Sequence, residues 1–359
     1  MVVGAGLMGA SAAWHLARRG LNTVLLERFE LNNQRGSSHG VARIFRLVYD
    51  IPEYVELARM ALPLWREAER ELGQDLLWTT GGLDIGPPEQ VAALAHVLSS
   101  VEVPYQNLSA RQLMSRFPFD VAADWEALFQ PDGGVLHADA CRLGLAELAR
   151  RAGARIVTGT PVTSISTSRA GVSVQTATGA WDAEAVVLAA GSWANPLVEP
   201  LGLHVPLKVT REHVAYYRGP TDAAVVPFIF RQEPAQLHFY GLPNWRSGQV
   251  KVGINASGPE VNPDDDPVLD RATLQPIEDC VHRFLPSFGP VPESVETCLY
   301  ASTPDDDFVM ERVGPIILGI GFGGHGFKFG PAIGTLLADL VEGRAIPAAT
   351  RFRYSRFAA

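Results

Sequence analysis

The sequence predicts an α/β protein of two interleaved domains, and three observations lead to this expectation. The chain opens on a strand, a glycine turn, a helix and a second strand, which is a βαβ beginning. A middle region, about residues 206–297, holds several extended segments that suit an antiparallel sheet. The final strand, glycine turn and helix resemble the first, and no internal repeat or long linker separates these parts.

The first half of the chain alternates helical and extended patterns. A strand over 1–3 leads through the glycine turn into a helix at 10–19, and a strand follows at 23–26. An apolar stripe opposite charged residues predicts a helix over 54–72, and alternation indicates a strand at 83–85. A helix at 143–152 leads to strands at 154–157 and 172–176, and a buried strand ends at 189–191. Because the first strand is so short, we expect that a few natural residues precede it.

The second half is first extended and then returns to a strand and a helix. Extended segments are expected at 212–217, 237–240 and 249–254. An apolar run at 315–320, a glycine-rich turn at 321–326 and a helix through 334–341 close the chain.

Composition narrows the class of protein. With 359 residues, 47% of them hydrophobic, the chain is long enough for two cores. No apolar run approaches the roughly 20 residues that cross a bilayer, and a net charge of −9 without a basic run disfavours nucleic acid and membrane partners. Three scattered cysteines suit neither a disulfide framework nor a zinc site. Without an export signal, we expect a cytoplasmic protein that acts on small molecules.

The opening glycines form a nucleotide-binding pattern. Gly4, Gly6 and Gly9 satisfy G-x-G-x-x-G between a strand and a helix. The first glycine permits a tight turn, the second lets backbone approach a pyrophosphate, and the third lets the helix pack on the strand. Glu27 ends the next strand, where its carboxylate suits ribose hydroxyls and disfavours a 2′-phosphate. Together these features predict a Rossmann dinucleotide site, and they leave FAD and NAD both open.

Three later segments resemble the monomeric sarcosine oxidase and N-methyltryptophan oxidase family in order and approximate spacing. They are GSSHGVARIFR at 36–46, TCLYASTPDDDF at 297–308 and GFGGHGFKF at 321–329. The segments 130–134 and 190–193 add weaker support. The likeness extends over nearly the whole chain and favours FAD over NAD.

This resemblance implies a glutathione-reductase-type FAD-binding Rossmann domain, interleaved with an α+β substrate domain on a mainly antiparallel sheet. We expect residues 1–80, 135–205 and 296–359 in the FAD-binding domain, and 81–134 and 206–295 in the substrate domain. The resemblance implies FAD contacts by Gly4, Gly6, Leu7, Met8, Gly9, Glu27, Arg28, Ser37, His39, Arg43, Ile44, Val162, Ala190, Gly191, Trp193, Cys298, Tyr300, Phe322, Gly324, His325, Gly326, Phe327 and Lys328.

The resemblance also implies covalent attachment of the flavin. In the family, the cysteine equivalent to Cys298 forms a thioether to the flavin 8-methyl carbon, and nearby positive charge would assist by lowering the thiol pKa. A lone cysteine is more often a small buried hydrophobe, but the Cys-x-Tyr-x-x-Thr-Pro-Asp pattern favours attachment. Cys141 and Cys280 have no such context and are expected to be structural.

The implied reaction is oxidation of the C–N bond of a secondary or N-methylated amino acid to an imine, with O₂ reduced to H₂O₂ by a monomeric enzyme. Lys251 is expected against the flavin as a catalytic cation, although a lysine on a strand ordinarily faces solvent. Arg46 and Lys328 are the expected carboxylate clamp. Catalytic or substrate roles are also implied for Arg43, Tyr240 and His325, although each charge taken singly is more typical of a surface.

One position departs from the family pattern. Sarcosine oxidases have a histidine four residues after the lysine equivalent to Lys251, and this chain has Asn255. Asparagine forms hydrogen bonds but does not titrate near neutrality, so polarity and volume over the flavin should differ. Asn255 is therefore expected to contact the substrate, and sarcosine, proline, pipecolate and bulkier N-methyl compounds all stay open.

Three other functions compete with this interpretation. A flavin dehydrogenase would pass electrons to a protein or quinone, which Lys251 disfavours. A non-catalytic flavin-binding protein is disfavoured because the chain retains Cys298, Lys251, Arg46 and Lys328 together. An NAD-linked dehydrogenase would leave the two C-terminal motifs without a purpose.

Overall fold

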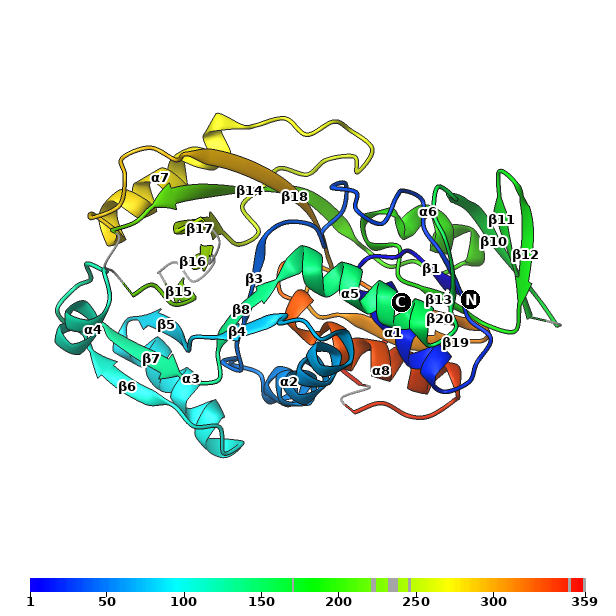
Figure 1. The fold of residues 1–359 in the computed structure, drawn as a ribbon, viewed down its shortest axis with the longest axis horizontal. Helices are drawn as coiled ribbons and strands as arrows, with labels where there is room; N and C mark the ends of the chain where they lie inside the picture. The colour runs from blue at the N-terminus through cyan, green and yellow to red at the C-terminus, as the bar shows by residue number, and fades with distance from the viewer. Residues whose placement is uncertain (170, 221–223, 232–237, 245–246, 348–349, 358–359) are drawn as a thin grey trace.

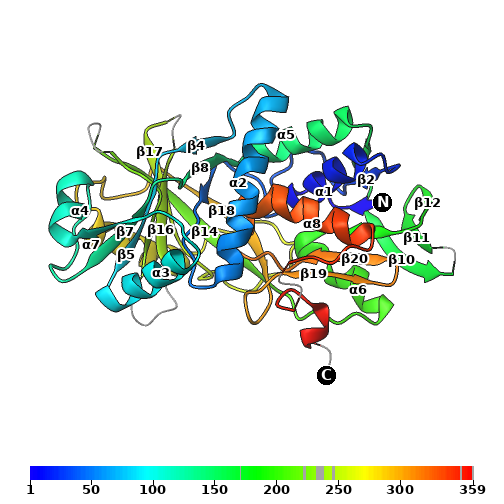
Figure 2. The ribbon, with the colours of Figure 1, turned by 90° about the horizontal axis from the view of Figure 1, so that it is seen from below.

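The computed structural model describes the chain except residues 170, 221–223, 232–237, 245–246, 348–349 and 358–359. Two large sheets follow one another along the long axis of the molecule (Figure 1). Helix α2, Pro52–Leu72, lies between them (Figure 2). No helix of the described ranges is both long and apolar enough to cross a membrane.

The first sheet has six strands in the order β19-β20-β13-β1-β2-β9. Its strands are parallel apart from β19, which runs antiparallel to β20. The strand bounds are β1 Val2–Val3, β2 Val24–Leu26, β9 Arg155–Val157, β13 Val186–Leu188, β19 Val309–Val313 and β20 Ile316–Ile320. The first and last βα units therefore share one sheet, as the similarity of the two ends predicts.

Alternating side chains cover both faces of this sheet. Val2 and Leu25 face a core shared with the helices, whereas Val3 and Leu26 face a core on the opposite side. The helices are α1 Leu7–Arg18, α5 Ala138–Arg151 and α8 Gly330–Val341; the other face carries α6 Asn195–Val198 and the antiparallel strands β10 Val162–Ser168, β11 Gly171–Thr176 and β12 Gly179–Ala183. The result is the three-layered, Rossmann-type fold that the sequence predicts.

Local sequence accounts for the helix boundaries. Helix α1 begins three residues earlier than expected, directly after Gly6. Helix α5 also begins earlier because the side chain of His137 accepts a hydrogen bond from Ala140 N at 3.1 Å and caps it. Gly73 ends α2 in the left-handed region at φ 68°. A Cβ on Gly334 would lie 2.1 Å from Ser11 Oγ, so glycine lets α8 pack closely on α1.

The second large sheet has eight strands in the order β18-β14-β17-β16-β15-β5-β7-β6. All neighbours are antiparallel except β15 and β5, so the predicted mainly antiparallel sheet is confirmed. Its bounds are β5 Gly82–Gly86, β6 Gln106–Ser109, β7 Glu126–Gln130, β14 Lys208–Arg218, β15 Phe228–Phe230, β16 Phe239–Asn244, β17 Gln249–Ile254 and β18 Ser294–Ser302. Residue 237 of the expected segment 237–240 lies outside the described residues.

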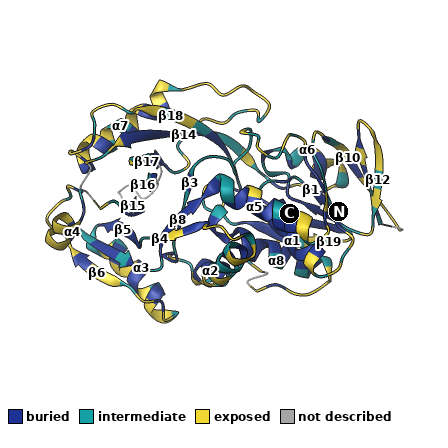
Figure 3. Cartoon of the chain, viewed as in Figure 1, coloured by how far each residue is buried: buried dark blue, intermediate teal, exposed yellow. Residues whose placement is uncertain are grey.

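One face of this sheet is an aromatic core. Phe228, Phe230 and Phe239 pack there with Phe284, and the ring centroids of Phe230 and Phe284 are 4.3 Å apart. Nearby helices are α3 Pro88–Ser100, α4 Ala110–Arg116 and α7 Arg271–Phe284. Buried residues predominate in the inner strands of both large sheets, whereas exposed ones occur on the edge strand β6, the outer helices and the loops (Figure 3). Because side chains alternate along a strand, the other face is left for a site.

A small sheet in the order β3-β8-β4 adjoins the two large ones, with bounds Ala42–Phe45, Gly134–His137 and Leu77–Thr79. Strand β18 lies mostly in the segment expected for the FAD-binding domain, yet it pairs with β14 in the second sheet. The domain boundaries given above stay a prediction.

Candidate active site

The glycine loop between β1 and α1 is too tight for a side chain at two positions. Gly4 has φ +96°, and a Cβ on it would lie 2.5 Å from the carbonyl oxygen of Ala189. A Cβ on Gly9 would lie 1.8 Å from the carbonyl oxygen of Gly4. Gly6 is the N-cap of α1, so the N–H groups of the first turn have no partner within the helix, and that of Leu7 donates to Ser38 Oγ. Gly9 packs the helix on the loop and lines neither cavity described below.

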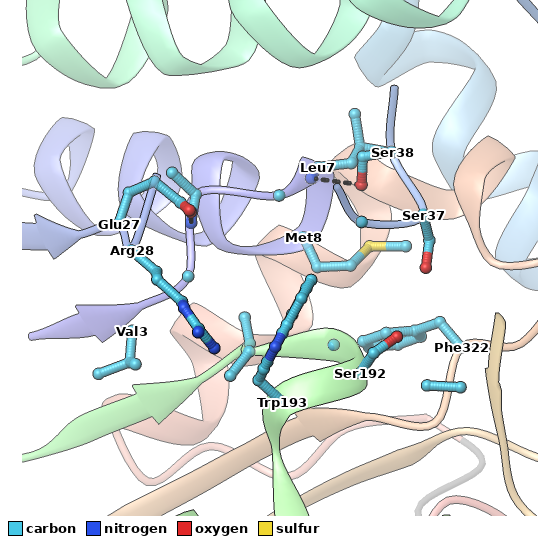
Figure 4. Close-up of a pocket in the computed structure, with 18 of the residues that line it drawn as sticks. Val3, Leu7, Met8, Glu27, Arg28, Ser37, Ser38, Ser192, Trp193 and Phe322 are labelled. Carbon is cyan, nitrogen blue, oxygen red and sulfur yellow. Dashed lines mark hydrogen bonds between the residues drawn. The ribbon is translucent and has the colours of Figure 1, made fainter. Parts of the chain in front are cut away.

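A cavity of about 350 Å³ lies against this loop. Figure 4 shows Glu27 and Arg28 at one end and Ser37 and Phe322 at the other, with Met8 and Trp193 between them. Most of the expected FAD contacts line it: Gly4, Gly6, Leu7, Met8, Glu27, Arg28, Ser37, His39, Arg43, Val162, Ala190, Gly191, Trp193, Tyr300, Phe322, Gly324, Gly326 and Phe327.

Glu27 is held rigidly at the end of β2. One carboxylate oxygen accepts a hydrogen bond from Ala5 N at 2.6 Å, and the other accepts from Phe29 N at 2.9 Å. A carboxylate has about four acceptor positions, so lone pairs remain for hydroxyl groups in the cavity. The opposite end of the loop is fixed by Ser38, whose Oγ accepts from Leu7 N at 3.1 Å (Figure 4).

A contact that sequence reasoning missed closes the Glu27 end of the cavity. Residues 257–270, which we call the strap, run from the second sheet to this end (Figure 1). Asp264 Oδ1 accepts hydrogen bonds from Trp193 Nε1 and lies 2.9 Å from Arg28 Nη2. Arg28 Cζ lies 5.1 Å from the ring centroid of Phe29 and 5.5 Å from that of Trp193. No local pattern around Asp264 signals this contact.

A second cavity, of about 320 Å³, lies against the free face of the eight-stranded sheet. Arg43, Tyr300, Gly324 and Phe327 line both cavities, so the two adjoin. All other expected catalytic, substrate and flavin residues except Gly9 line the second cavity: Ile44, Arg46, Tyr240, Lys251, Asn255, Cys298, His325 and Lys328. The fold therefore brings together residues that lie far apart in the sequence.

Lys251 points from β17 into this buried space and not into solvent. The residue is 4% exposed, and Nζ donates to the carbonyl oxygen of Ala42 at 3.5 Å. Arg43 Nη1 donates to the same carbonyl at 2.9 Å. Burial, and then the charge of Arg43, lower the pKa of Lys251 to about 7.

Cys298 is buried on β18 directly opposite Glu212 of β14. Burial raises the pKa of the Cys298 thiol, and the nearby charges of Arg43 and Lys251 oppose this rise without overcoming it. The positive neighbourhood that the sequence leads us to expect is therefore present, but desolvation outweighs it. Of the described cysteines, Cys141 and Cys280 line neither cavity.

Arg46 and Lys328 meet on Tyr49, which sequence reasoning missed. Lys328 Nζ donates to Tyr49 Oη at 2.8 Å and to the His325 carbonyl at 2.5 Å. Arg46 Cζ lies 4.3 Å from the centroid of the Tyr49 ring, and Arg46 Nη1 donates to the Val48 carbonyl. Burial, and then Arg46, hold the pKa of Lys328 well below its usual range. An anion bound here would relieve the repulsion between the two cations.

His325 is a neutral side chain in this arrangement. Burial, and then Lys328, lower its pKa to about 3. Its Nε2 lies 3.1 Å from the Asp306 carbonyl, which can only accept, so Nε2 carries the proton. Nδ1 then accepts from Tyr49 Oη at 3.4 Å. A chain of hydrogen bonds thus runs from Lys328 through Tyr49 to His325.

Tyr240 and Asn255 border the place where the two cavities meet. Burial raises the pKa of Tyr240, so its hydroxyl stays protonated at neutral pH. A Cβ on Gly253 would lie 2.8 Å from that hydroxyl, so glycine makes room for it. A Cβ on Gly324 would lie 2.3 Å from the Tyr300 ring and 2.5 Å from Asn255 Oδ1.

Two more residues belong to the second cavity although no motif marks them. Arg231 lines the cavity, and Asp84 lies behind it in the wall. Arg231 donates to Asp84 Oδ1 through Nη2 at 2.7 Å, and Arg46 Nη1 lies 3.8 Å from the same oxygen. The sequence marks Asp84 only by its place between the apolar residues Leu83 and Ile85. Strand alternation then puts its carboxylate on the face opposite the core side chains of Leu83 and Ile85.

The residues present fit a dinucleotide with a redox-active ring. The glycine cradle leaves no room for a Cβ, the N-terminus of α1 suits a pyrophosphate, and Glu27 suits a ribose. The adjoining cavity adds a buried thiol and buried cations.

Fold and cavities together define a Rossmann-type dinucleotide-binding protein with a second cavity beside the nucleotide site. The model of the FAD dependent oxidoreductase family matches residues 1–340, and the chain belongs to that family. Peroxisomal sarcosine oxidase of Homo sapiens is 32% identical over 355 residues, covering 95% of this chain and 91% of that protein. Monomeric sarcosine oxidase of Bacillus sp. (strain NS-129) is 30% identical over 358 residues, covering 95% and 92%.

Among solved structures, NikD, an unusual amino acid oxidase essential for nikkomycin biosynthesis, superimposes in its open form with a TM-score of 0.86. It is 31% identical, and the match covers 98% of this chain and 96% of NikD. The chain therefore belongs with the sarcosine oxidase-like branch of FAD-dependent oxidoreductases, as its three motifs predict.

Proposed function

We propose that this protein oxidises the C–N bond of a secondary or N-methylated amino acid to an imine, with O₂ as electron acceptor and H₂O₂ as product. One observation carries the proposal: two basic side chains, Arg46 and Lys328, line the same cavity as Lys251 and Cys298, and this cavity adjoins the dinucleotide site. When bound, FAD supplies the redox chemistry, namely two-electron oxidation of the substrate and reduction of O₂.

The chain's own residues bind and orient the substrate. Arg46 offers a planar fork to the carboxylate and Lys328 a point charge, and Tyr49 holds both in place. Tyr240, with its protonated hydroxyl, and Asn255 border the rest of the substrate. Because Lys328 and Tyr49 are themselves buried, their polar contacts count for more than they would at a surface.

Lys251 supports the choice of oxygen as acceptor. Its amine is buried beside Arg43, where a positive charge stabilises negative charge that develops nearby during the reduction of O₂. Its pKa of about 7 means that the amine can take up or release a proton near neutral pH.

Cys298 is the proposed point of covalent attachment, through a thioether to the flavin 8-methyl carbon. The thiol and the methyl group would each lose a proton as the C–S bond forms, and the two electrons released would pass through the flavin to O₂. The support for Cys298 is its place in the sequence motif and its position on β18 beside Tyr300, which lines both cavities. Arg43 and Lys251 favour the thiolate that such a bond requires. A cytoplasmic location and a monomeric state stay predictions.

An anaerobic screen tests the proposal. The purified holoenzyme is mixed without oxygen with N-methylated, cyclic and primary amino acids, and bleaching of the flavin absorption is followed. We expect secondary or N-methylated amino acids to bleach it and air to restore the colour promptly with stoichiometric H₂O₂. Reduced flavin that persists in air contradicts the oxidase and indicates a dehydrogenase, and a flavin that no amine bleaches contradicts both.

A further inference from the structure

Asp84 joins two arginines of the substrate cavity. Its side chain is 3% exposed, and its Oδ1 accepts hydrogen bonds from Arg231 Nε at 3.0 Å and Nη2 at 2.7 Å. The same oxygen lies 3.8 Å from Arg46 Nη1. Arg46 and Arg231 both line the cavity. One buried carboxylate thus faces two guanidinium groups that would otherwise repel one another.

The backbone fixes both ends of the Asp84–Arg231 pair. Asp84 sits in the middle of β5, a fully buried strand, in register with Ile229 of β15. Arg231 follows β15, and its backbone N donates to the Ile85 carbonyl at 2.7 Å. A Cβ on Gly86 would lie 2.9 Å from Arg231 Cβ, so glycine lets the arginine approach closely. The pair is therefore a rigid part of the cavity wall.

Arg46 is less firmly fixed. Apart from Asp84, its guanidinium has two contacts among the residues that the structure describes. Its guanidinium stacks on Tyr49 and donates to the Val48 carbonyl. Neither contact carries a formal negative charge. Among the described residues, Asp84 is the one carboxylate within ion-pair distance of Arg46.

We propose that Asp84 is a positioning residue, which holds Arg46 and Arg231 as a pair so that the substrate carboxylate completes the charge balance of the array. Two arginines and one aspartate leave one net positive charge before Lys328 is counted, and a buried net charge favours an anionic ligand. The inference rests on the proposed carboxylate site at Arg46 and deepens it.

A positioning role for Asp84 and a purely electrostatic role predict opposite changes in anion affinity when Asp84 is replaced. By electrostatics alone, Asp84→Asn adds one positive charge to the site and should tighten binding of an anion. If Asp84 positions the arginines, the same change lets the two guanidiniums move apart, so that they no longer present their donors together to one carboxylate and binding weakens. The sign of the change therefore decides between them.

The Kd for acetate, measured on the oxidised holoenzyme, shows whether anion affinity falls or rises, and no turnover is needed. Acetate carries a carboxylate and no amine, and its binding is read from the perturbed flavin absorption spectrum. We expect the Kd for acetate to rise on the order of tenfold in Asp84→Asn. In Asp279→Asn, which removes the same charge from the exposed side of α7, the Kd should not change. An unchanged or lower Kd in Asp84→Asn overturns the inference.

A second variant covers the case in which Asp84→Asn does not fold. In Arg231→Lys, the positive charge stays but the paired hydrogen bonds of the guanidinium to Asp84 are lost, so electrostatics alone leaves the Kd unchanged, whereas loss of positioning should raise it severalfold. An unchanged Kd in this variant also overturns the inference. If both single variants fold, the double variant should resemble Asp84→Asn, because the two residues act as one unit; additive effects contradict this.

An acetate titration of the natural protein shows whether a failure concerns the role of Asp84 or the proposed carboxylate site. If acetate leaves its flavin spectrum unchanged up to saturating concentrations, the carboxylate site itself is wrong and the role of Asp84 is wrong with it. If acetate binds to the natural protein and equally well to Asp84→Asn and Arg231→Lys, the carboxylate site stands and only the positioning role is wrong.

Discussion

Tyr49 accepts a hydrogen bond from Lys328 Nζ at 2.8 Å while its ring lies under the guanidinium of Arg46, 4.3 Å from Cζ to the centroid. One tyrosine thus contacts both cations of the proposed carboxylate clamp, through its hydroxyl and through its π face. Burial raises the pKa of Tyr49 to about 12, so the hydroxyl keeps its proton and can donate it toward His325. The clamp is therefore a three-residue unit that includes a neutral phenol.

Removing this hydroxyl should weaken substrate binding. Tyr49→Phe keeps the ring under Arg46 but takes a hydrogen-bond acceptor from the buried Lys328 ammonium, which then ionises less readily. We expect KM to rise on the order of tenfold with little change in kcat. Steady-state kinetics measure both constants. Tyr105→Phe, which removes an exposed hydroxyl that pairs with Ser99, serves as the control, and equal KM values in the two variants contradict the role of Tyr49.

Replacing the buried lysine should separate the two halves of the reaction. In Lys251→Met, substrate still reduces the flavin, but reoxidation by O₂ should slow by about 10²-fold because a preorganised cation is lost. Stopped-flow absorption measures each half separately. Lys208→Met makes the same change at an exposed position on β14 and should leave both rates unaltered. Reoxidation at the natural rate in Lys251→Met would refute the role.

The same lysine predicts two dependences on pH. Its folded pKa of about 7 lies below the usual 10.5, so the amine loses its charge as pH rises through about 7. Reoxidation should slow over that range in the natural protein and stay level in Lys251→Met.

The free energy of unfolding should rise with pH over the range in which reoxidation slows. Between about pH 7 and 10.5 the unfolded chain binds a proton at Lys251 that the folded chain does not, so this residue makes the free energy of unfolding rise with pH. Urea unfolding from pH 7 to 10 should show a steeper rise in the natural protein than in Lys251→Met. If the free energy of unfolding changes with pH equally in both proteins, Lys251 stays protonated in the folded state.

Covalent attachment is tested by acid denaturation. The natural protein should keep yellow colour on its precipitate, with a flavin-sized mass increase on the peptide that contains Cys298. Cys298→Ser should release all its FAD, and Cys280→Ser, on α7 away from both cavities, should release none. Complete release of FAD from the natural protein would show that the cofactor is not covalently bound.

The strap should slow the escape of FAD at the Glu27 end. Asp264 contacts both Trp193 and Arg28, whereas Asp266 is 93% exposed and only reaches Arg35, at 3.4 Å. In a Cys298→Ser background, Asp264→Ala should speed the release of FAD by about tenfold, and Asp266→Ala should not. Fluorescence of the released FAD measures the rate, and equal rates in the two variants would exclude a role for Asp264.

The sequence by itself determined the parts of this protein that depend on local backbone geometry and on motifs. Gly4, Gly6 and Gly9 with Glu27 predicted a dinucleotide site because turn, helix N-terminus and strand end follow one another within a short stretch. The motifs around Arg43, Cys298 and Lys328 predicted the family that the comparisons confirm. Except Gly9, every residue singled out for FAD or substrate lines one of the two cavities.

Only the tertiary structure decided which side chains meet across the sheets. Asp84 reaches Arg231 because β5 pairs with β15, and Asp264 reaches Arg28 because the strap crosses from one sheet to the other. Such contacts depend on strand pairing and register over more than a hundred residues, which no local pattern encodes. Burial likewise set the pKa of Lys251 near 7, because desolvation depends on everything that surrounds the amine and not on its neighbours in the chain.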